Sequence, residues 1–350
     1  MPVPPLRLHI DDPRHAGSTR RAGLSALVAV VVLLGLYVAL PGIAGLDETW
    51  GLLARGDPWW LGAAVLLEAC SYLGYVLLFR GVFVGPGSPI GWRESYAITM
   101  AGVAATRLLA TGGAGGIALT AWALARSGMG RKELVRRLTT FYVALYSVFV
   151  TTLLVLGLGL RYGLFEGPAP FGATVLPAAL GGFVIAGALV TAVLPRDFGR
   201  RLAGLGGGRL ARYARSFAAG AATVAEGVRG ALAMLRRGDP ALLGALAWWT
   251  FDVAVLWACF HAFGTPPPLA VVVMAYFAGM LGNLLPLPGG VGGVDGGMIA
   301  AFLAFGVPAG LAVVAVLSYR AFAFWLPTIP GLLAYLQLRR TVRDWSRPIP

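Results

Sequence analysis

Long apolar runs alternate with short arginine-rich stretches along the 350 residues of this chain. A helix rises about 1.5 Å per residue, so a run of about 20 apolar residues crosses the roughly 30 Å of hydrocarbon in a bilayer. The last run contains Pro327 and Pro330, where we expect an interruption. The pattern predicts an all-α integral membrane bundle of about eight to ten segments. These segments are expected at about residues 22–44, 58–83, 92–107, 138–160, 171–195, 240–263, 269–287 and 309–338, with short stretches after the glycine-rich passages as further candidates.

The composition agrees with a membrane bundle and excludes an ordinary soluble domain. Hydrophobic residues make up 58% and charged residues 12% of the chain, against roughly 45–50% and 25% in soluble domains. The apolar runs are also much longer than the roughly ten-residue alternating strands of a membrane β-barrel. Cys70 and Cys259 lie inside predicted segments and the three histidines are scattered, so we expect no metal site and no cofactor. We recognise no nucleophile arrangement and expect no enzyme.

The formal charge of +13 comes almost wholly from arginine, because Lys132 is the single lysine among 28 basic residues. The arginines gather between the apolar runs, which favours a role in membrane orientation and anionic-lipid contact over nucleic-acid binding. The positive-inside rule then places four basic segments in the cytoplasm: the N-terminal tail, the loop at 126–137, the segment 196–237 and the C-terminal tail. We therefore expect a multi-pass membrane protein with both termini cytoplasmic.

The chain divides into two similar halves. Gly56-Asp57-Pro58 recurs as Gly238-Asp239-Pro240, and Ala101–Gly116 aligns without a gap on Ala278–Gly293, so that two glycine-rich breaks coincide. The resulting organisation is a disordered basic tail (1–21), an anchor helix (22–44), a first repeat (45–195), an Arg-rich amphipathic linker (196–237), a second repeat (238–338) and a basic tail (339–350).

Each repeat is expected to contain a broken or re-entrant helix at its glycine-rich passage. A glycine costs up to about 1 kcal/mol relative to alanine in a helix, so neither passage forms a stable straight helix. If the short segment after each break crosses the membrane completely, all basic segments stay in the cytoplasm; this is the arrangement we favour. If it only dips in and returns, the number of spans falls to eight, but the loop at 126–137 and the Arg-rich segment 196–237 would face outside. Such inverted repeats are typical of secondary transporters, in which two breaks approach each other near the midplane.

The second break is the strongest candidate for a binding site. It runs from Pro286 to Asp295 and restarts a helix whose amide groups can bind an anion such as a lipid phosphate. The alternative is that the glycines only let two helices cross closely. The glycines assigned to headgroup binding are Gly112 and Gly113 in the first break and Gly289, Gly290, Gly292 and Gly293 in the second.

Charged side chains within the apolar segments supply the remaining candidates. Arg320 lies inside the last segment and Arg107 just before the first break, where a charge costs about 2.5–3.5 kcal/mol unless it meets a partner or a water-filled cavity. A guanidinium binds phosphate with two parallel hydrogen bonds, so we assign both arginines and Asp295 to headgroup binding. The alternative for Arg320 is a structural ion pair with Asp295 or Asp252. Glu68 and Asp252 are candidates for proton coupling or for internal hydrogen bonding.

The sequence from Pro288-Gly289-Gly290-Val291-Gly292-Gly293-Val294-Asp295 to Pro330-Gly331 resembles the lysylphosphatidylglycerol synthase transmembrane, or flippase-like, family. Phe305-Gly306-Val307-Pro308 and Ser318-Tyr319-Arg320 belong to the same resemblance, which covers about residues 22–338. Family members commonly carry glutamate at the position of Asp295, and a proline where Ala110-Thr111 stand. The resemblance implies a location in a bacterial cell membrane. It also implies a lipid-translocating or lipid-handling role, as in the membrane part of enzymes that aminoacylate phosphatidylglycerol and export the product. We expect no synthase domain here.

Two functional hypotheses follow from these features. The first is a lipid translocator that moves or binds an anionic phospholipid or glycolipid headgroup in a midplane cavity. The second is an integral-membrane partner of a cell-envelope polyprenyl-phosphate glycosyltransferase. Membrane lipids are the expected partners, and nucleic acid is not.

Overall fold

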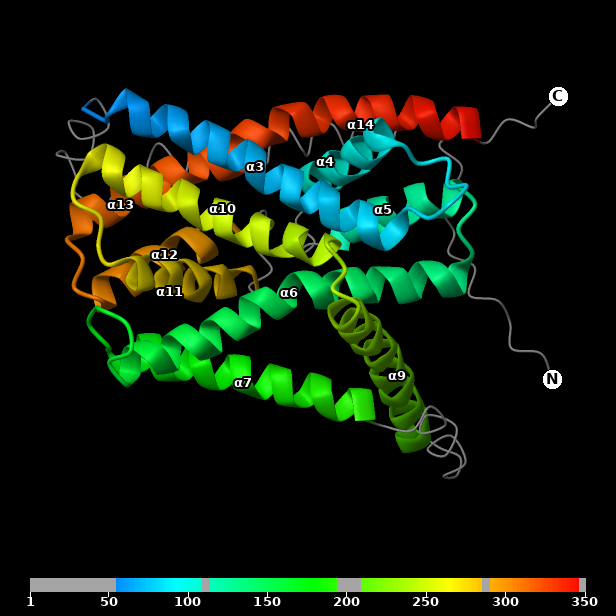
Figure 1. The fold of residues 1–350 in the computed structure, drawn as a ribbon, viewed down its shortest axis with the longest axis horizontal. Coiled ribbons are helices and arrows are strands. Elements are labelled where there is room, and N and C mark those ends of the chain that lie inside the picture. Colours follow the sequence, from blue (N-terminus) through cyan, green and yellow to red (C-terminus); the bar gives the residue numbers. More distant parts are fainter. Residues whose placement is uncertain (1–54, 109–113, 194–208, 285–289, 346–350) are drawn as a thin grey trace. The chain divides into compact units, whose positions relative to one another are not determined.

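The computed structural model describes residues 55–108, 114–193, 209–284 and 290–345, and every regular element within them is helical (Figure 1). Within these residues, five helices are long and apolar enough to cross a membrane. They are α3 (Pro58–Phe83), α6 (Arg131–Arg161), α7 (Phe171–Val193), α10 (Ala241–Phe263) and the composite helix Ala309–Arg343. The expectation of an all-α membrane bundle is confirmed. The predicted tail 1–21 and anchor 22–44 lie outside the described residues.

The repeated Gly-Asp-Pro motif starts one long helix in each half. Asp57 accepts a hydrogen bond from the backbone N–H of Trp59 at 2.8 Å, and Asp239 accepts one from Ala241 at 3.0 Å. These carboxylates satisfy amides that lack a partner inside the helix, and the adjacent proline needs no such partner. A local sequence signal therefore sets the starts of α3 and α10.

Helices α3 and α10 pack against each other and run in opposite directions (Figure 1). A Cβ atom on Gly74 would lie 2.8 Å from the backbone nitrogen of Trp248, so glycine is needed for this close approach. Ser71 donates a hydrogen bond to the Trp248 carbonyl at 2.9 Å. These two residues are 177 positions apart, the same offset that aligns the two glycine breaks. In an inverted repeat, equivalent positions of the two halves meet where the two-fold axis between the halves passes. The contact between Ser71 and Trp248 is of this kind.

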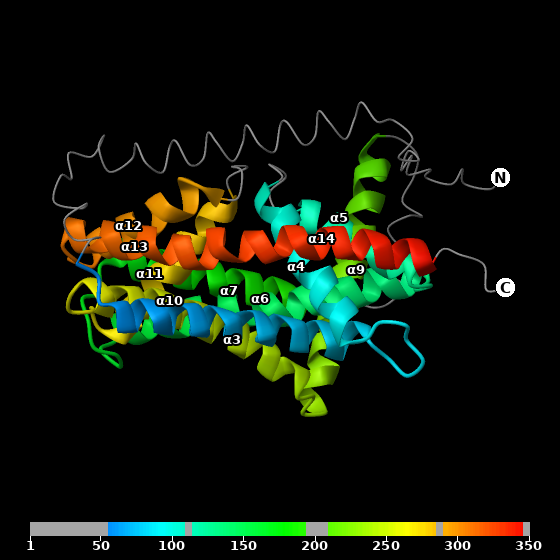
Figure 2. The same ribbon diagram turned by 90° about the horizontal axis from the view of Figure 1, so that it is seen from above.

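Each half continues with a pair of short helices that forms a hairpin. The pairs are α4 (Trp92–Leu108) with α5 (Ala114–Arg126), and α11 (Leu269–Met280), extended by the 3₁₀ turn η1 (Leu281–Leu284), with α12 (Gly293–Ala304). Figures 1 and 2 show that α4 and α5 enter from the end of the bundle where α6 starts, whereas α11 and α12 enter from the opposite end. Both hairpins return to the end from which they came.

Three helices of the two hairpins, α5, α11 and α12, are short. Helices of 12 and 13 residues are about 18–20 Å long, which is shorter than the roughly 30 Å hydrocarbon core. Glycines hold the arms together: a Cβ on Gly282 would lie 2.6 Å from the backbone nitrogen of Val294, and one on Gly279 would lie 2.7 Å from that of Met298. Because α4 and α5 turn back together, the basic loop at 126–137 lies at the end of the bundle where α6 starts (Figure 1).

The last membrane helix is interrupted earlier than the sequence predicted. Helix α13 (Ala309–Arg320) passes into a π-helical turn, η3 (Ala321–Trp325), and then into α14 (Leu326–Trp345). Both prolines lie within α14. Proline has no backbone N–H, so it donates no hydrogen bond to the carbonyl four residues earlier, and the irregular turn therefore precedes the prolines. For Pro327 that carbonyl belongs to Ala323. Helix α14 also continues past the predicted end at residue 338.

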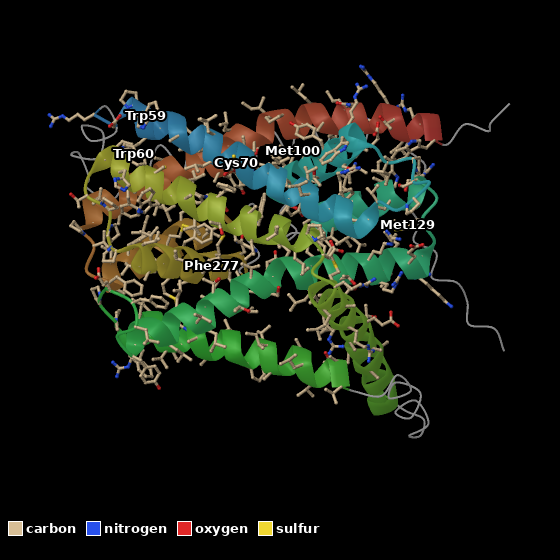
Figure 3. All side chains as sticks on the ribbon, in the orientation of Figure 1. Trp59, Trp60, Cys70, Met100, Met129 and Phe277 are labelled. Atoms are coloured by element: carbon tan, nitrogen blue, oxygen red, sulfur yellow. The ribbon has the colours of Figure 1, made fainter. Side chains whose placement is uncertain are left out.

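Helix α9 (Arg209–Arg236) accounts for the described part of the predicted Arg-rich linker and packs on α6 and α7. Gly227 and Gly230 bring it close to Thr139 and Thr140 of α6. At the opposite end of the bundle, at the start of α3, Trp60 stacks on His261 of α10 with ring centroids 4.3 Å apart. Figure 3 labels Trp60 beside the exposed Trp59 at this start, a position that suits an interfacial aromatic residue.

Candidate functional site

A cavity of about 690 Å³ lies between the two halves of the bundle. Its volume falls within the roughly 300–1,000 Å³ that is usual for small-molecule sites. Glu68, Arg107 and Tyr142 line it from the first half, and Trp249, Asp252 and Arg320 line it from the second. Four of these side chains, Glu68, Arg107, Asp252 and Arg320, are predicted from the sequence to bind a headgroup or to couple protons, and the structure brings all four to one cavity.

Arg107, near the end of α4, is held by contacts inside the protein. Its guanidinium donates hydrogen bonds to the carbonyls of Ala323 and Phe324, at 2.5 and 2.9 Å, and to the hydroxyl of Tyr72 at 2.5 Å. In an α-helix the carbonyl of Ala323 would accept the N–H of residue 327, but Pro327 has no N–H to donate. Arg107 therefore joins the first hairpin to the interrupted last helix by satisfying its exposed backbone.

Arg320 and Asp295 form the buried ion pair that sequence analysis left as an alternative. The Arg320 Nε lies 2.5 Å from Oδ1 of Asp295, and the side chains are 7% and 3% exposed. The other carboxylate oxygen of Asp295 accepts the backbone N–H of Gly292 at 3.0 Å, which caps the start of α12. The guanidinium of Arg320 also lies 4.5 Å from the ring centre of Phe324, so it faces the cavity beside an aromatic surface.

Asp252 is bound by two tyrosine hydroxyls. Tyr276 donates a hydrogen bond to one carboxylate oxygen, and Tyr319 lies 3.1 and 3.2 Å from the two oxygens. Tyr319 and Asp252 both line the cavity. The arrangement matches the internal-hydrogen-bonding alternative for Asp252, and it ties α10 to α11 and α13.

Glu68 differs from the other buried charges. It is 4% exposed and lines the cavity from α3. Its Oε2 atom has no hydrogen-bond partner among the described residues. A buried carboxylate oxygen without a partner is costly unless a ligand or water completes it. Glu68 is therefore the side chain in this cavity that is best placed to receive a ligand.

The glycine assignments divide into three groups. Gly290 lines the cavity and has a φ of +68°, a backbone conformation that favours glycine. Gly292 and Gly293 lie at the start of α12 and do not line the cavity. Gly112, Gly113 and Gly289 lie outside the described residues. Gly116, which follows the first break, also lines the cavity, so described residues beside both breaks share one space.

Comparison with known proteins then decides the family. The lysylphosphatidylglycerol synthase TM region family matches residues 24–331. The chain belongs to this family. It is 25% identical over 332 residues to a UPF0104 membrane protein of Methanothermobacter thermautotrophicus, covering 89% of this chain and 92% of the relative. A second match to a UPF0104 membrane protein of that organism is 33% identical over 91 residues, or 26% of each chain.

The family resemblance stated from the sequence is confirmed, and its motif residues now have positions in this member of the lysylphosphatidylglycerol synthase TM region family. Asp295 and Arg320 are the two partners of the buried ion pair. Tyr319 binds Asp252. Gly306, with a φ of +80°, forms the turn between α12 and α13. Of these motif residues, Tyr319 and Arg320 line the cavity, and Asp295 holds Arg320 in place.

Sequence reasoning missed the aromatic walls of the cavity in this family member. Tyr75, Tyr142, Tyr146, Trp248 and Trp249 line it, and the rings of Tyr75 and Trp248 lie 4.7 Å apart. Aromatic residues are common in apolar helices, so only their positions in the fold distinguish them. Within the described residues, no group of three or more histidine, cysteine, aspartate or glutamate side chains is placed to hold a metal ion.

Proposed function

We propose that this protein binds a membrane lipid by its headgroup in the cavity between the two hairpins and moves it across the membrane without chemical reaction. The observation that carries the proposal is Glu68, a buried carboxylate in an apolar bundle with an oxygen that lacks a partner among the described residues. Buried charges within membrane helices usually mark substrate or ion pathways. The two hairpins that enter from opposite ends support a re-entrant, inverted-repeat transporter plan.

The charges around the cavity favour a headgroup that carries an amine. Arg107 and Arg320 contribute two formal positive charges, and Glu68, Asp252 and Asp295 contribute three negative charges. Both guanidinium groups already contact protein acceptors, so the carboxylate of Glu68 is the group that most needs a counter-ion. An ammonium group supplies that charge. The aromatic rings of Tyr75 and Trp248 add faces that attract cations.

This charge balance changes our expectation of a purely anionic headgroup. A phospholipid that combines an ammonium with its phosphate fits the cavity better, with the ammonium near Glu68. The family description refers to lysylphosphatidylglycerol, whose lysyl group carries amines, and this supports the same class. We place the role of glycosyltransferase partner second, because the guanidinium groups that would bind a polyprenyl phosphate are engaged by protein atoms.

We also infer that the Arg-rich end of the bundle faces the cytoplasm. The basic start of α6 and the basic end of α14 lie at the same end of the bundle (Figure 1). Basic residues next to membrane helices are enriched on the cytoplasmic side. Hairpin α4–α5 then enters from the cytoplasmic leaflet and hairpin α11–α12 from the opposite leaflet.

Transfer of labelled lipids in liposomes tests this proposal. The purified protein is expected to move an aminoacyl phospholipid faster than phosphatidylglycerol, which has the phosphate but no amine. Glu68→Gln should lower the rate for the amine-bearing lipid by about tenfold or more and leave thermal stability unchanged or higher, since a buried carboxylate is removed. Glu226→Gln, at an exposed residue of α9, is the matched control. Equal rates for Glu68→Gln and wild type, or no transfer by the wild type, would contradict the proposal.

A further inference from the structure

The cavity opens sideways between α5 and α6. Three of its lining side chains are also exposed at the surface of the described structure: Ile117 on α5 is 41% exposed, and Val135 and Tyr146 on α6 are 41% and 49% exposed. Between them, Leu138 and Tyr142 of α6 line the cavity and are partly buried. An apolar path thus leads from the surface of the bundle to the polar interior.

The depth of this opening corresponds to one leaflet. Arg137 donates hydrogen bonds to the carbonyls of Val82 and Phe83 at 2.9 and 3.0 Å, so it marks the level at which α3 ends. Tyr146 lies nine positions after Arg137, which is about 14 Å along α6, and half of a roughly 30 Å hydrocarbon core is about 15 Å. On the facing wall, Ile117 lies the same number of positions before the basic end of α5.

The chemistry at the outer edge of the opening suits a phospholipid. Arg131, Lys132 and Arg136 are exposed at the start of α6, at the level where lipid phosphates lie. Deeper in, Ile117, Val135 and Tyr146 offer an apolar and aromatic surface suited to a hydrocarbon chain. Positive charge at headgroup level and apolar side chains below it match the order of groups in a phospholipid.

We propose that the gap between α5 and α6 is the lateral entrance by which a phospholipid from the leaflet at the Arg-rich end reaches the cavity. An acyl chain occupies the gap between Ile117 and Tyr146, while the headgroup moves inward toward Glu68. This inference rests on the proposed lipid-binding function and adds to it the leaflet of origin and the route.

Two tryptophan substitutions test the route by narrowing the entrance. Ile117→Trp and Val135→Trp add bulk on its opposite walls and should lower the rate of lipid transfer by about tenfold, with the melting temperature unchanged. Val155→Trp is the matched control, because Val155 is 51% exposed on the same helix but does not line the cavity. Equal rates in all three variants would overturn the entrance. A wild-type protein that transfers no lipid would instead overturn the proposed function.

Photocrosslinking tests the occupant independently of transfer. A benzophenone amino acid in place of Ile117 is activated in proteoliposomes of phosphatidylethanolamine and phosphatidylglycerol, and the products are identified by mass spectrometry. A phospholipid adduct supports the proposal even if transfer fails. An adduct with residues 22–44 of the same chain, an adduct with a second copy, or no adduct overturns it, because the gap is then covered by protein or closed to lipid.

Discussion

Replacing Arg320 by glutamine removes one half of a buried ion pair and leaves Asp295 without its counter-ion. Both side chains are nearly inaccessible, and the charged atoms lie 2.5 Å apart. Breaking such a pair from one side costs about 3–5 kcal/mol, because the remaining charge stays buried. At roughly 2–4 °C per kcal/mol, Arg320→Gln should lower the melting temperature by about 6–20 °C.

Removing both charges should recover part of that loss. Asp295→Asn keeps a side-chain oxygen that can accept the backbone N–H of Gly292, so the start of α12 retains its cap. The double variant Arg320→Gln with Asp295→Asn then contains no uncompensated charge at this position. We expect a coupling energy of about 1–3 kcal/mol between the two substitutions, in the sense that the double variant is more stable than the sum of the single effects predicts.

A thiol-reactive dye can measure this cycle in detergent. Cys259 is fully buried and reacts only on unfolding, provided that the exposed Cys70 is replaced by serine in all variants. Arg136→Gln, at an exposed arginine, is the control and should change stability by less than about 0.5 kcal/mol. The reasoning is refuted if Arg320→Gln is no less stable than this control, or if the double variant is less stable than the additive sum.

Two further predictions concern backbone contacts that can be checked in the same unfolding assay. Arg107→Lys should cost about 1–3 kcal/mol, because one ammonium cannot reproduce the planar contacts to the Ala323 and Phe324 carbonyls. The loss should be smaller in a Pro327→Ala background, where the Ala323 carbonyl regains a helical donor. Gly282→Ala should cost about 1–3 kcal/mol, because its Cβ would meet the backbone of α12. Gly62→Ala, where a Cβ meets nothing within 4 Å, should instead be neutral or stabilising by up to about 1 kcal/mol.

Helix positions were predictable from the sequence wherever local signals act. Asp57 and the proline after it mark the start of α3, and the apolar run that follows ends at Phe83 as expected. Helix α7 spans nearly the predicted residues. The broken helices were also predictable from their glycines. In each case the deciding interactions lie within a few residues along the chain, so a linear pattern contains them.

The contacts of the site were not predictable, because they join distant parts of the chain. Arg107 and the Ala323 carbonyl are 216 positions apart, and Asp252 and Tyr319 are 67 apart. No local pattern distinguishes Tyr319 from other tyrosines in apolar helices. The sequence left open whether the first hairpin crosses or turns back, because the 17 residues of α4 are close to the minimum length of a membrane span.

Some buried charges of this protein contact protein groups, whereas Glu68 has a carboxylate oxygen without a partner among the described residues. We expect the first kind to affect stability and Glu68 to affect lipid transfer. A broken helix in an apolar interior exposes backbone groups that must be satisfied by protein. Arg107 does this for the carbonyls of the interrupted last helix, and Asp295 does it for the start of α12, with Arg320 balancing the charge of Asp295. These three side chains are thus required by the breaks themselves, and their substitution lowers stability whether or not a lipid binds. Glu68 lies in the unbroken helix α3, whose backbone groups need no side-chain partner at this position. A loss of lipid transfer at unchanged stability is therefore expected at Glu68 and not at the other three.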